Sequence, residues 1–316
     1  MLTRILSHSK LVFCLVFLTV AYTGAYAQFA SEIPLDFDQV EPALHLRNPG
    51  YVNNDASFTG NLGYQGFNSL SKNLKTFYAN ALFTLADTSS RSHHIGLQSY
   101  TDQEGVFIQH NRIYARYAYQ LALNQKVDLS LGLAAGVINF SVKENPALGT
   151  FNKTKFDVKV GGQISGSKAS FNVSVLQFLD QKVTFETGEL TLKRYYQGFG
   201  NYVMDLGPTI RFEPAIFVRY ASGYRTDLRM IGTLIIHDQA YVSLTGGFPS
   251  SMVLGAGLRE IDLLQLKFQL GLSYRLWFEN DSQRQVNLME FTLAIKKQEK
   301  SKQGYILDAN LLNNQL

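Results

Sequence analysis

The chain has 316 residues, with 29 Lys plus Arg against 25 Asp plus Glu and a formal net charge of +4. This near balance excludes strong electrostatic capture of nucleic acid as a bulk property. Aromatic residues make up 13% of the chain and charged residues only 17%, whereas about a quarter of the residues are charged in ordinary soluble domains. The chain thus has much apolar surface, yet it lacks the heptad-like clusters typical of buried helices.

Residues 1–27 have the features of a secretory signal peptide. Arg4 and Lys10 form a basic region, an apolar run follows, and an A-x-A cleavage site ends at Ala27. We expect cleavage after Ala27; the alternative is an uncleaved anchor helix. Two bases and no acid leave with this segment, so 27 bases would remain against 25 acids. Cys14 is the only cysteine, so the mature chain would have no disulfide, thiolate metal site or cysteine nucleophile.

After residue 27, no stretch approaches the ~20 apolar residues that a membrane helix needs. From about residue 55 to 295 the sequence instead alternates with a period of two. In residues 112–121 the odd positions are apolar or aromatic, and in residues 264–276 the even positions are. Such runs are about as long as a tilted strand that crosses a bilayer. If this protein enters a membrane, it does so as strands.

The alternation defines about fourteen segments, near residues 55–64, 76–84, 93–100, 107–121, 127–140, 153–164, 169–177, 194–206, 210–220, 225–235, 239–246, 252–259, 264–276 and 285–295. Single-chain bacterial outer-membrane barrels have an even number of strands, with short periplasmic turns and longer extracellular loops. Connections after even segments are short, whereas several after odd segments are long: 65–75, 141–152, 178–193 and 277–284. Connections 221–224 and 247–251 break this trend.

The sequence therefore predicts an all-β fold, a transmembrane antiparallel up-and-down barrel over residues 55–295. Backbone groups in hydrocarbon must be paired within the protein, so such a sheet must close. The alternative is a soluble β-sandwich or a periplasmic lipid carrier, which would have shorter strands and more proline. We expect residues 28–54 to form an N-terminal periplasmic segment. The C-terminal polar tail 296–316 is either a disordered extension or a periplasmic docking peptide.

We expect no catalytic, cofactor or metal site. His93 and His94 are adjacent on a predicted strand, so they project to opposite faces and cannot chelate one ion. Neither a G-x-S-x-G nor an H-E-x-x-H motif is present. A barrel enzyme that uses isolated side chains stays open as an alternative. Gly161 and Gly162 lie within a strand, where they indicate close packing rather than a phosphate-binding loop.

Charged side chains occupy the less apolar face of the predicted strands. Facing lipid, each Arg or Lys would cost ~2–4 kcal/mol at the midplane, so we expect these side chains to line the lumen. They either coat a solute pore or pair with one another and plug the lumen. The set comprises Arg112, Arg116, Lys155, Asp157, Lys159, Arg211, Glu213, Arg219, Arg225, Asp227, Arg229, Lys267, Arg275 and Glu290.

Four different short motifs occur one after another along the chain. An Asn-Pro-Gly-Tyr segment precedes the first strand, and a Tyr-rich strand runs into Leu-Ser-Leu-Gly-Leu. Lys-Phe-Asp-Val-Lys and Pro-Ala-Ile-Phe-Val-Arg-Tyr strands follow. Over most of residues 45–276, this series resembles the PorP/SprF family of type IX secretion system membrane proteins of Bacteroidetes. The motif residues are Asn48, Pro49, Tyr51, Tyr117, Gly132, Asp157, Pro214, Arg219 and Asp227.

The resemblance implies a bacterial outer-membrane protein that helps protein substrates, such as gliding-motility adhesins, to be secreted or held at the surface. Loops 65–75, 141–152 and 178–193 would contact secreted protein outside. The short turns, and the tail, would meet periplasmic or outer-membrane secretion components. The alternative is a solute-conducting porin. Two departures from the family pattern, acidic residues before Asn48 and Gly247-Phe248 in place of Tyr-Arg, concern the partner more than the fold.

Overall fold

The computed structural model describes residues 37–53, 56–67, 74–88, 90–104, 108–145, 149–184, 189–223, 226–248, 251–263, 265–277 and 288–298. The predicted signal peptide, Arg225 and the predicted tail beyond Gln298 lie outside these ranges. Within them, no helix has the length and hydropathy to span a bilayer.

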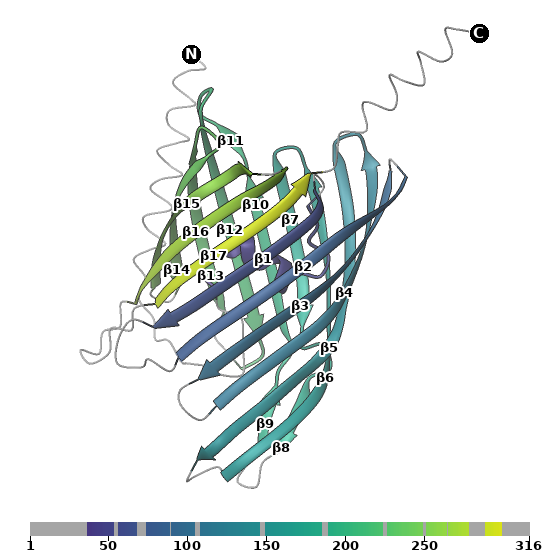
Figure 1. Cartoon of the computed structure of the whole chain (residues 1–316), viewed down its shortest axis with the longest axis vertical. Coiled ribbons are helices and arrows are strands. Elements are labelled where there is room, and N and C mark those ends of the chain that lie inside the picture. Colours follow the sequence, from purple (N-terminus) through teal and green to yellow (C-terminus); the bar gives the residue numbers. More distant parts are fainter. Residues whose placement is uncertain are drawn as a thin grey trace.

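The strands form one closed antiparallel sheet, the wall of a barrel (Figure 1). The sheet has fifteen strands, of which fourteen form the wall and the two-residue β11 (Met204–Asp205) extends the pairing of β12. The ring closes because β1 pairs with β17 and β10 pairs with β12. The wall strands are β1 (Ala56–Phe67), β2 (Leu74–Thr88), β3 (Arg91–Glu104), β4 (Ile108–Asn124), β5 (Val127–Asn145), β6 (Gly149–Gly166), β7 (Ala169–Leu176), β10 (Tyr195–Tyr202), β12 (Ile210–Ala221), β13 (Asp227–Ile236), β14 (Ala240–Phe248), β15 (Ser251–Leu263), β16 (Leu266–Trp277) and β17 (Leu288–Gln298).

The predicted fold is confirmed, and each of the fourteen predicted segments coincides with one wall strand. Two of the predicted long loops are wrong in detail. Most of 141–152 is strand, because β5 runs to Asn145 and β6 begins at Gly149. The connection 178–193 contains a hairpin, β8 (Gln181–Thr184) with β9 (Glu189–Leu192). Both stretches are polar enough to resemble loops in the sequence, yet within their described residues β5 pairs with β6 and β8 pairs with β9.

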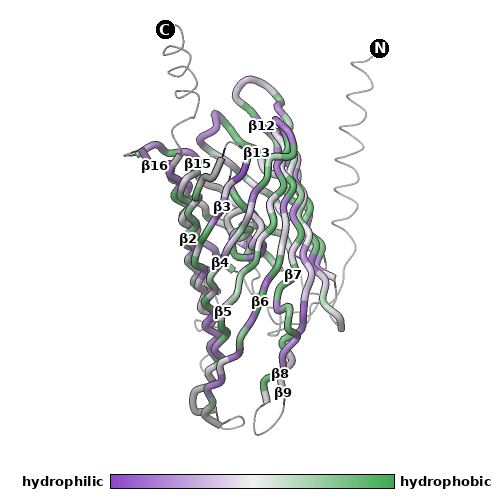
Figure 2. The backbone as a smooth tube through the Cα atoms, turned by 90° about the vertical axis from the view of Figure 1, so that its right-hand side faces the viewer, coloured by the Kyte–Doolittle hydropathy of each residue, from purple (hydrophilic) through white to green (hydrophobic). Residues whose placement is uncertain are grey.

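The alternation separates an apolar outer face from a buried inner face, and Figure 2 shows the two kinds of residue interleaved along the strands. On β5, Leu131 is 59% exposed and Leu133 is 48% exposed, while Ser130 and Ala134 are buried. Other large exposed apolar residues, such as Leu97 and Phe171, occur on neighbouring strands. An outward apolar band over an inward polar face is the pattern of a membrane barrel.

The boundary between the barrel and the predicted tail lies later than expected. Residues Lys296 and Lys297 belong to β17, where they pair with Thr59 and Phe58 of β1. Strand pairing uses backbone groups, so a charged side chain does not end a strand once the strand reaches the polar edge of the membrane.

Residues 37–53 run inside the barrel and include the helix α2 (Val40–Arg47) (Figure 1). We call these residues the plug. The sequence predicts an N-terminal periplasmic segment over residues 28–54 and does not predict this position inside the barrel. All plug residues whose burial is described are buried, except Tyr51 and Asn53, which are half-buried.

The outward face of β5 offers a test of the membrane band. Leu133→Arg is expected to lower the free energy of unfolding in lipid vesicles by roughly 2–4 kcal/mol, because the guanidinium would face hydrocarbon. The matched control is Leu123→Arg near the short-turn end, where the cost falls to about 0–1 kcal/mol. Urea titration of both variants measures this difference, and equal losses would contradict the assignment of the band.

Candidate functional site: the plugged lumen and the long-loop end

Wall side chains hold the N-terminal end of the plug through its backbone. Glu290 of β17 accepts hydrogen bonds from the N–H groups of Asp38 (2.5 Å) and Gln39 (3.3 Å). Arg275 of β16 forms a buried ion pair with the Asp38 carboxylate. Thr292 donates to the Gln39 side-chain oxygen at 2.6 Å. Asp38 and Gln39 immediately precede α2, so the Glu290 carboxylate lies at the N-terminal end of the helix, where negative charge complements the helix dipole.

Wall cations hold the C-terminal end of α2. Arg116 of β4 donates to the carbonyl oxygens of His45 (3.3 Å), Pro49 (2.8 Å) and Tyr51. Lys159 of β6 donates to the Leu46 carbonyl at 3.3 Å. The last carbonyls of a helix have no partner within the helix, and its C-terminus favours positive charge. The two cations therefore stabilise the plug instead of coating an open pore.

The chain after α2 lies against glycines of the wall. Asn48 donates to the Gly162 carbonyl at 2.9 Å and to the Asn172 side-chain oxygen at 3.1 Å. A Cβ added at Gly132 would lie 2.1 Å from the Pro49 carbonyl oxygen, and one at Gly161 would lie 2.1 Å from Asn48 Oδ1. A side chain at either position would displace the plug. At Gly132, glycine is thus required by the close approach of two backbones, whereas at Gly161 the added atom would meet the Asn48 side chain.

Aromatic rings surround the buried cations. Lys159 lies 3.7 Å from the centroid of the Tyr114 ring, and Arg112 lies 5.0 Å from that of Tyr100. Tyr114 in turn donates to Asp157 at 2.7 Å. Cation–π contacts of this kind stabilise desolvated charges. Tyr100 and Tyr114 belong to a hydrophobic cluster of buried residues that also contains Phe37 and Leu46 of the plug.

The remaining predicted lumen charges that the structure describes lie on the same inner side, several of them in ion pairs. Asp227 bridges Arg219 and Arg229, each at 2.9 Å, and Arg229 also donates to the Phe37 carbonyl at 3.2 Å. Arg211 pairs with Asp238, Glu213 with Arg259, and Lys267 with Glu260. Lys155 is half-buried and forms no ion pair with a described residue.

Three of the family-motif residues have positions outside this plug network. Tyr117 is on the outer face, where its hydroxyl lies 2.7 Å from His93 Nδ1. Pro214 faces the break between β10 and β11, since Ala215 pairs with Asn201 and Phe212 with Met204. A proline, which has no N–H, is tolerated at such an interruption. Arg219 pairs with Asp227, which also pairs with Arg229, and Arg229 donates to the Phe37 carbonyl of the plug.

Three polar residues of the wall that contact the plug, Gln98, Gln163 and Asn172, were not predicted from the sequence, and neither was Gln39 of the plug itself. Gln163, for example, accepts a hydrogen bond from the Val52 N–H at 2.8 Å. One feature of the sequence could have pointed to Gln98, Gln163 and Asn172: they are polar residues on predicted strands.

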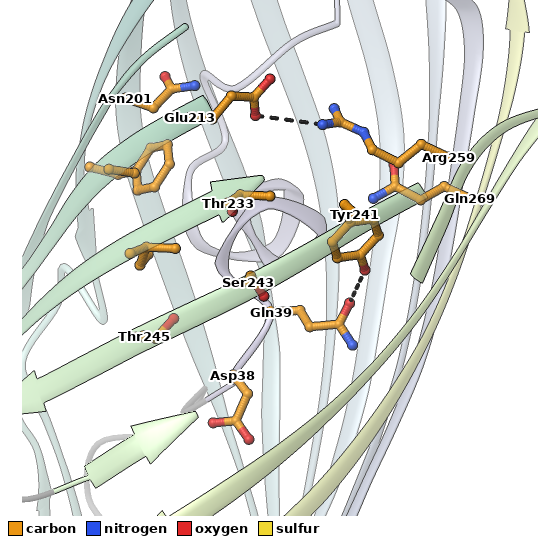
Figure 3. Close-up of a pocket in the computed structure, with 13 residues that line it drawn as sticks. Asp38, Gln39, Asn201, Glu213, Thr233, Tyr241, Ser243, Thr245, Arg259 and Gln269 are labelled. Carbon is orange, nitrogen blue, oxygen red and sulfur yellow. Dashed lines mark hydrogen bonds and ion pairs between the residues drawn. The ribbon is translucent and has the colours of Figure 1, made fainter. Parts of the chain in front are cut away.

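A small cavity remains between the plug and the wall near the short-turn end (Figure 3). Its volume is about 70 Å³, and polar residues such as Thr233, Ser243 and Gln269 line it. The Glu213–Arg259 pair (3.5 Å) and the Tyr241–Gln39 hydrogen bond (3.2 Å) border it. Such a volume holds a few water molecules.

Two hairpins, β5–β6 and β8–β9, pack on each other and extend the barrel at its long-loop end. The inner side of the β5–β6 hairpin, with Ile138 and Phe140, packs in one cluster with Val183 of β8 and Leu192 of β9. We call this part the tip: β5 from Ile138, β6 up to Phe156, and the β8–β9 hairpin. In Figure 1 the tip projects past the neighbouring strands.

The two adjacent histidines lie on opposite sides of the wall. His94 is buried and contacts Ser92, Thr84 and Gln120, whereas His93 is half-buried beside Tyr117. Among the described residues, no group of three His, Cys, Asp or Glu side chains could hold a metal ion.

Comparison with known proteins gives one family and a fold. A model described as type IX secretion system membrane protein PorP/SprF matches residues 30–315. No curated protein matches the chain. Among solved structures, the CymD monoaromatic hydrocarbon channel has a TM-score of 0.55 and 9% identity over 85% of this chain and 95% of that chain. A FadL homologue of Pseudomonas aeruginosa has a TM-score of 0.52 and 8% identity, over 81% of this chain and 94% of that chain. The Ralstonia pickettii toluene transporter TbuX has a TM-score of 0.52 and 9% identity, over 82% and 94%. At such identities the likeness shows an outer-membrane barrel fold alone.

Gly132→Ala tests whether the plug closes the lumen. The added methyl group would collide with the Pro49 carbonyl, so the plug should shift and the conductance of the purified barrel in planar bilayers should rise above that of the wild type. Gly198→Ala is the control, since its Cβ would meet nothing within 4 Å. Equal conductance of both variants would contradict a plug held at Gly132.

Arg116→Met tests the support of the plug's carbonyls. Three carbonyl oxygens would each lose a donor, so we expect the free energy of unfolding to fall by roughly 2–4 kcal/mol. Arg91→Met, at an exposed position of β3, should change it by less than about 0.5 kcal/mol. Denaturant titration of the two variants gives both numbers; a near-neutral Arg116→Met would show that water supplies these hydrogen bonds.

Proposed function

Because this chain belongs to the family of type IX secretion system membrane proteins PorP/SprF, we propose that it binds protein substrates of that system. It would aid their secretion or their attachment at the cell surface, and gliding-motility adhesins are one such class of substrate. Its outer-membrane-type barrel fits a position in the outer membrane, in contact with lipid. The family's description is that of a membrane component of a secretion system and not of an enzyme.

The observation that carries this proposal is the plugged lumen. Residues 37–53 fill the interior and bond to the wall through Glu290, Arg116 and Lys159. Transport of solute would have to disrupt these buried contacts, whereas binding at the barrel's ends leaves them intact. The tip offers a surface at the long-loop end, which is the extracellular end in barrels of this kind. The short turns would meet other secretion components on the periplasmic side.

A solute channel is the second candidate. It is favoured by the polar cavity beside Glu213 and Arg259 and by the likeness to CymD, which is described as a monoaromatic hydrocarbon channel. The wild-type barrel in planar bilayers separates the two functions. A closed barrel supports the binding protein, and a stable open conductance supports the channel.

Deletion of the gene tests the secretion role. In the deletion strain, at least one secreted protein should disappear from the cell surface or change its distribution between surface and medium. Quantitative proteomics of both fractions measures this, and re-expression of the wild-type gene should restore the pattern. An unchanged surface and secreted proteome would remove the proposed role.

A further inference from the structure

Strand β6 extends well past its neighbour β7 at the long-loop end. β6 spans Gly149–Gly166, yet β7 pairs with it only from Val160 to Ser165. On its other side β6 pairs with β5 over nearly its whole length. Among the described strands, none pairs with β6 before Val160 on the β7 side, and β8 and β9 pair with each other. Residues 152–155 therefore have one side that is paired with β5 and one side that no described strand pairs with, which we call the open edge of β6.

Two hydrogen bonds show which residues of β6 direct their backbone groups away from β5. The Phe178 N–H donates to the Val158 carbonyl at 3.0 Å, and the Gln181 side chain donates to the Phe156 carbonyl. In an antiparallel strand the N–H and C=O of one residue point to the same side, and that side alternates along the chain. Thr154 and Asn152 therefore direct both backbone groups toward the open edge. A row of such groups is a template for another strand.

The open edge lies outside the apolar band. The outer face of the β5–β6 hairpin carries Val137 and Phe156, which are 41% and 54% exposed. Beyond them this face is polar, and Asn139 donates to Asn152 at 2.6 Å and to Thr154 at 2.9 Å. A partner would thus approach the edge from water rather than through lipid.

The charges at the edge favour an acidic partner over a second copy of this chain. Lys153 is exposed and Lys155 is half-buried, and neither forms an ion pair with a described residue. Pairing of two copies edge to edge would bring lysines of both strands together, and like charges on neighbouring strands are destabilising. Acidic residues at alternate positions of an added strand would instead complement Lys153 and Lys155.

We propose that the open edge of β6 binds an extended, acidic segment of a secreted protein by β-strand addition. Backbone hydrogen bonds to Asn152 and Thr154 would give the affinity, and the two lysines would give the preference for acidic residues. The inference rests on the proposed function, since it names the place on the barrel where a secreted substrate binds.

Thr154→Pro tests the edge, because it removes an N–H that points away from β5, and proline is tolerated on an edge strand. Thr154→Ala is the matched control, which changes the side chain and keeps the N–H. The readout is the surface amount of those proteins that the deletion strain loses. It should fall on the order of tenfold with Thr154→Pro and stay at the wild-type level with Thr154→Ala. The double charge reversal Lys153→Glu with Lys155→Glu should also lower it.

The outcomes separate the two proposals. Loss of proteins in the deletion strain together with wild-type amounts in all three edge variants would overturn strand addition and leave the secretion role standing. No loss in the deletion strain would overturn both. Heat-modifiable migration of each variant shows whether the barrel has folded, and if Thr154→Pro fails to fold, the charge-reversal pair decides the question.

A photo-crosslinking residue in place of Asn152 tests the occupant. In living cells it should form a crosslink with one of the proteins that the deletion strain loses. Crosslinks between two copies of this chain alone would show that the edge joins barrels, and would overturn the proposal.

Discussion

A backbone polar group that is removed from water must find its partner within the protein, and this requirement shapes both parts of the molecule. In the wall it is met by strand pairing around a closed ring of fourteen strands. In the lumen it is met by side chains, because the plug is a short helix with extended ends that cannot satisfy its own terminal groups. The buried charges of the wall are the partners of those groups.

The sign of the charge at each end of the plug matches the direction of the helix dipole. Glu290 meets the first N–H groups of the plug, and Arg116 with Lys159 meets its last carbonyls. Each charge thereby gains hydrogen bonds and a favourable interaction with the helix dipole, which offsets the cost of removing it from water. The same arrangement holds the plug inside the lumen, and the proposed binding function uses the two ends of the barrel.

Much of the wall could be predicted from the sequence, because a period of two assigns each residue to a face without knowledge of its neighbours. That is why Arg116, Lys159 and Glu290 were expected to point inward. Their partners could not be predicted, since these are backbone atoms of a distant segment. The plug escaped prediction because α2 has only eight residues and no apolar periodicity. Residues 141–152 resemble a loop because the tip lies outside the apolar band. Outside the band, strands and loops are both polar, so polarity does not distinguish them.

The most direct measurement of a plugged lumen uses the scarcity of cysteine, since Cys14 lies in the predicted signal peptide. Leu46→Cys places a thiol on a plug residue with no exposed surface, and Gln125→Cys places one in an exposed short turn. With the purified, folded barrel and a water-soluble maleimide, we predict rapid labelling at position 125 and none at position 46 until the protein is denatured. Rapid labelling of both thiols in the folded barrel would contradict the account.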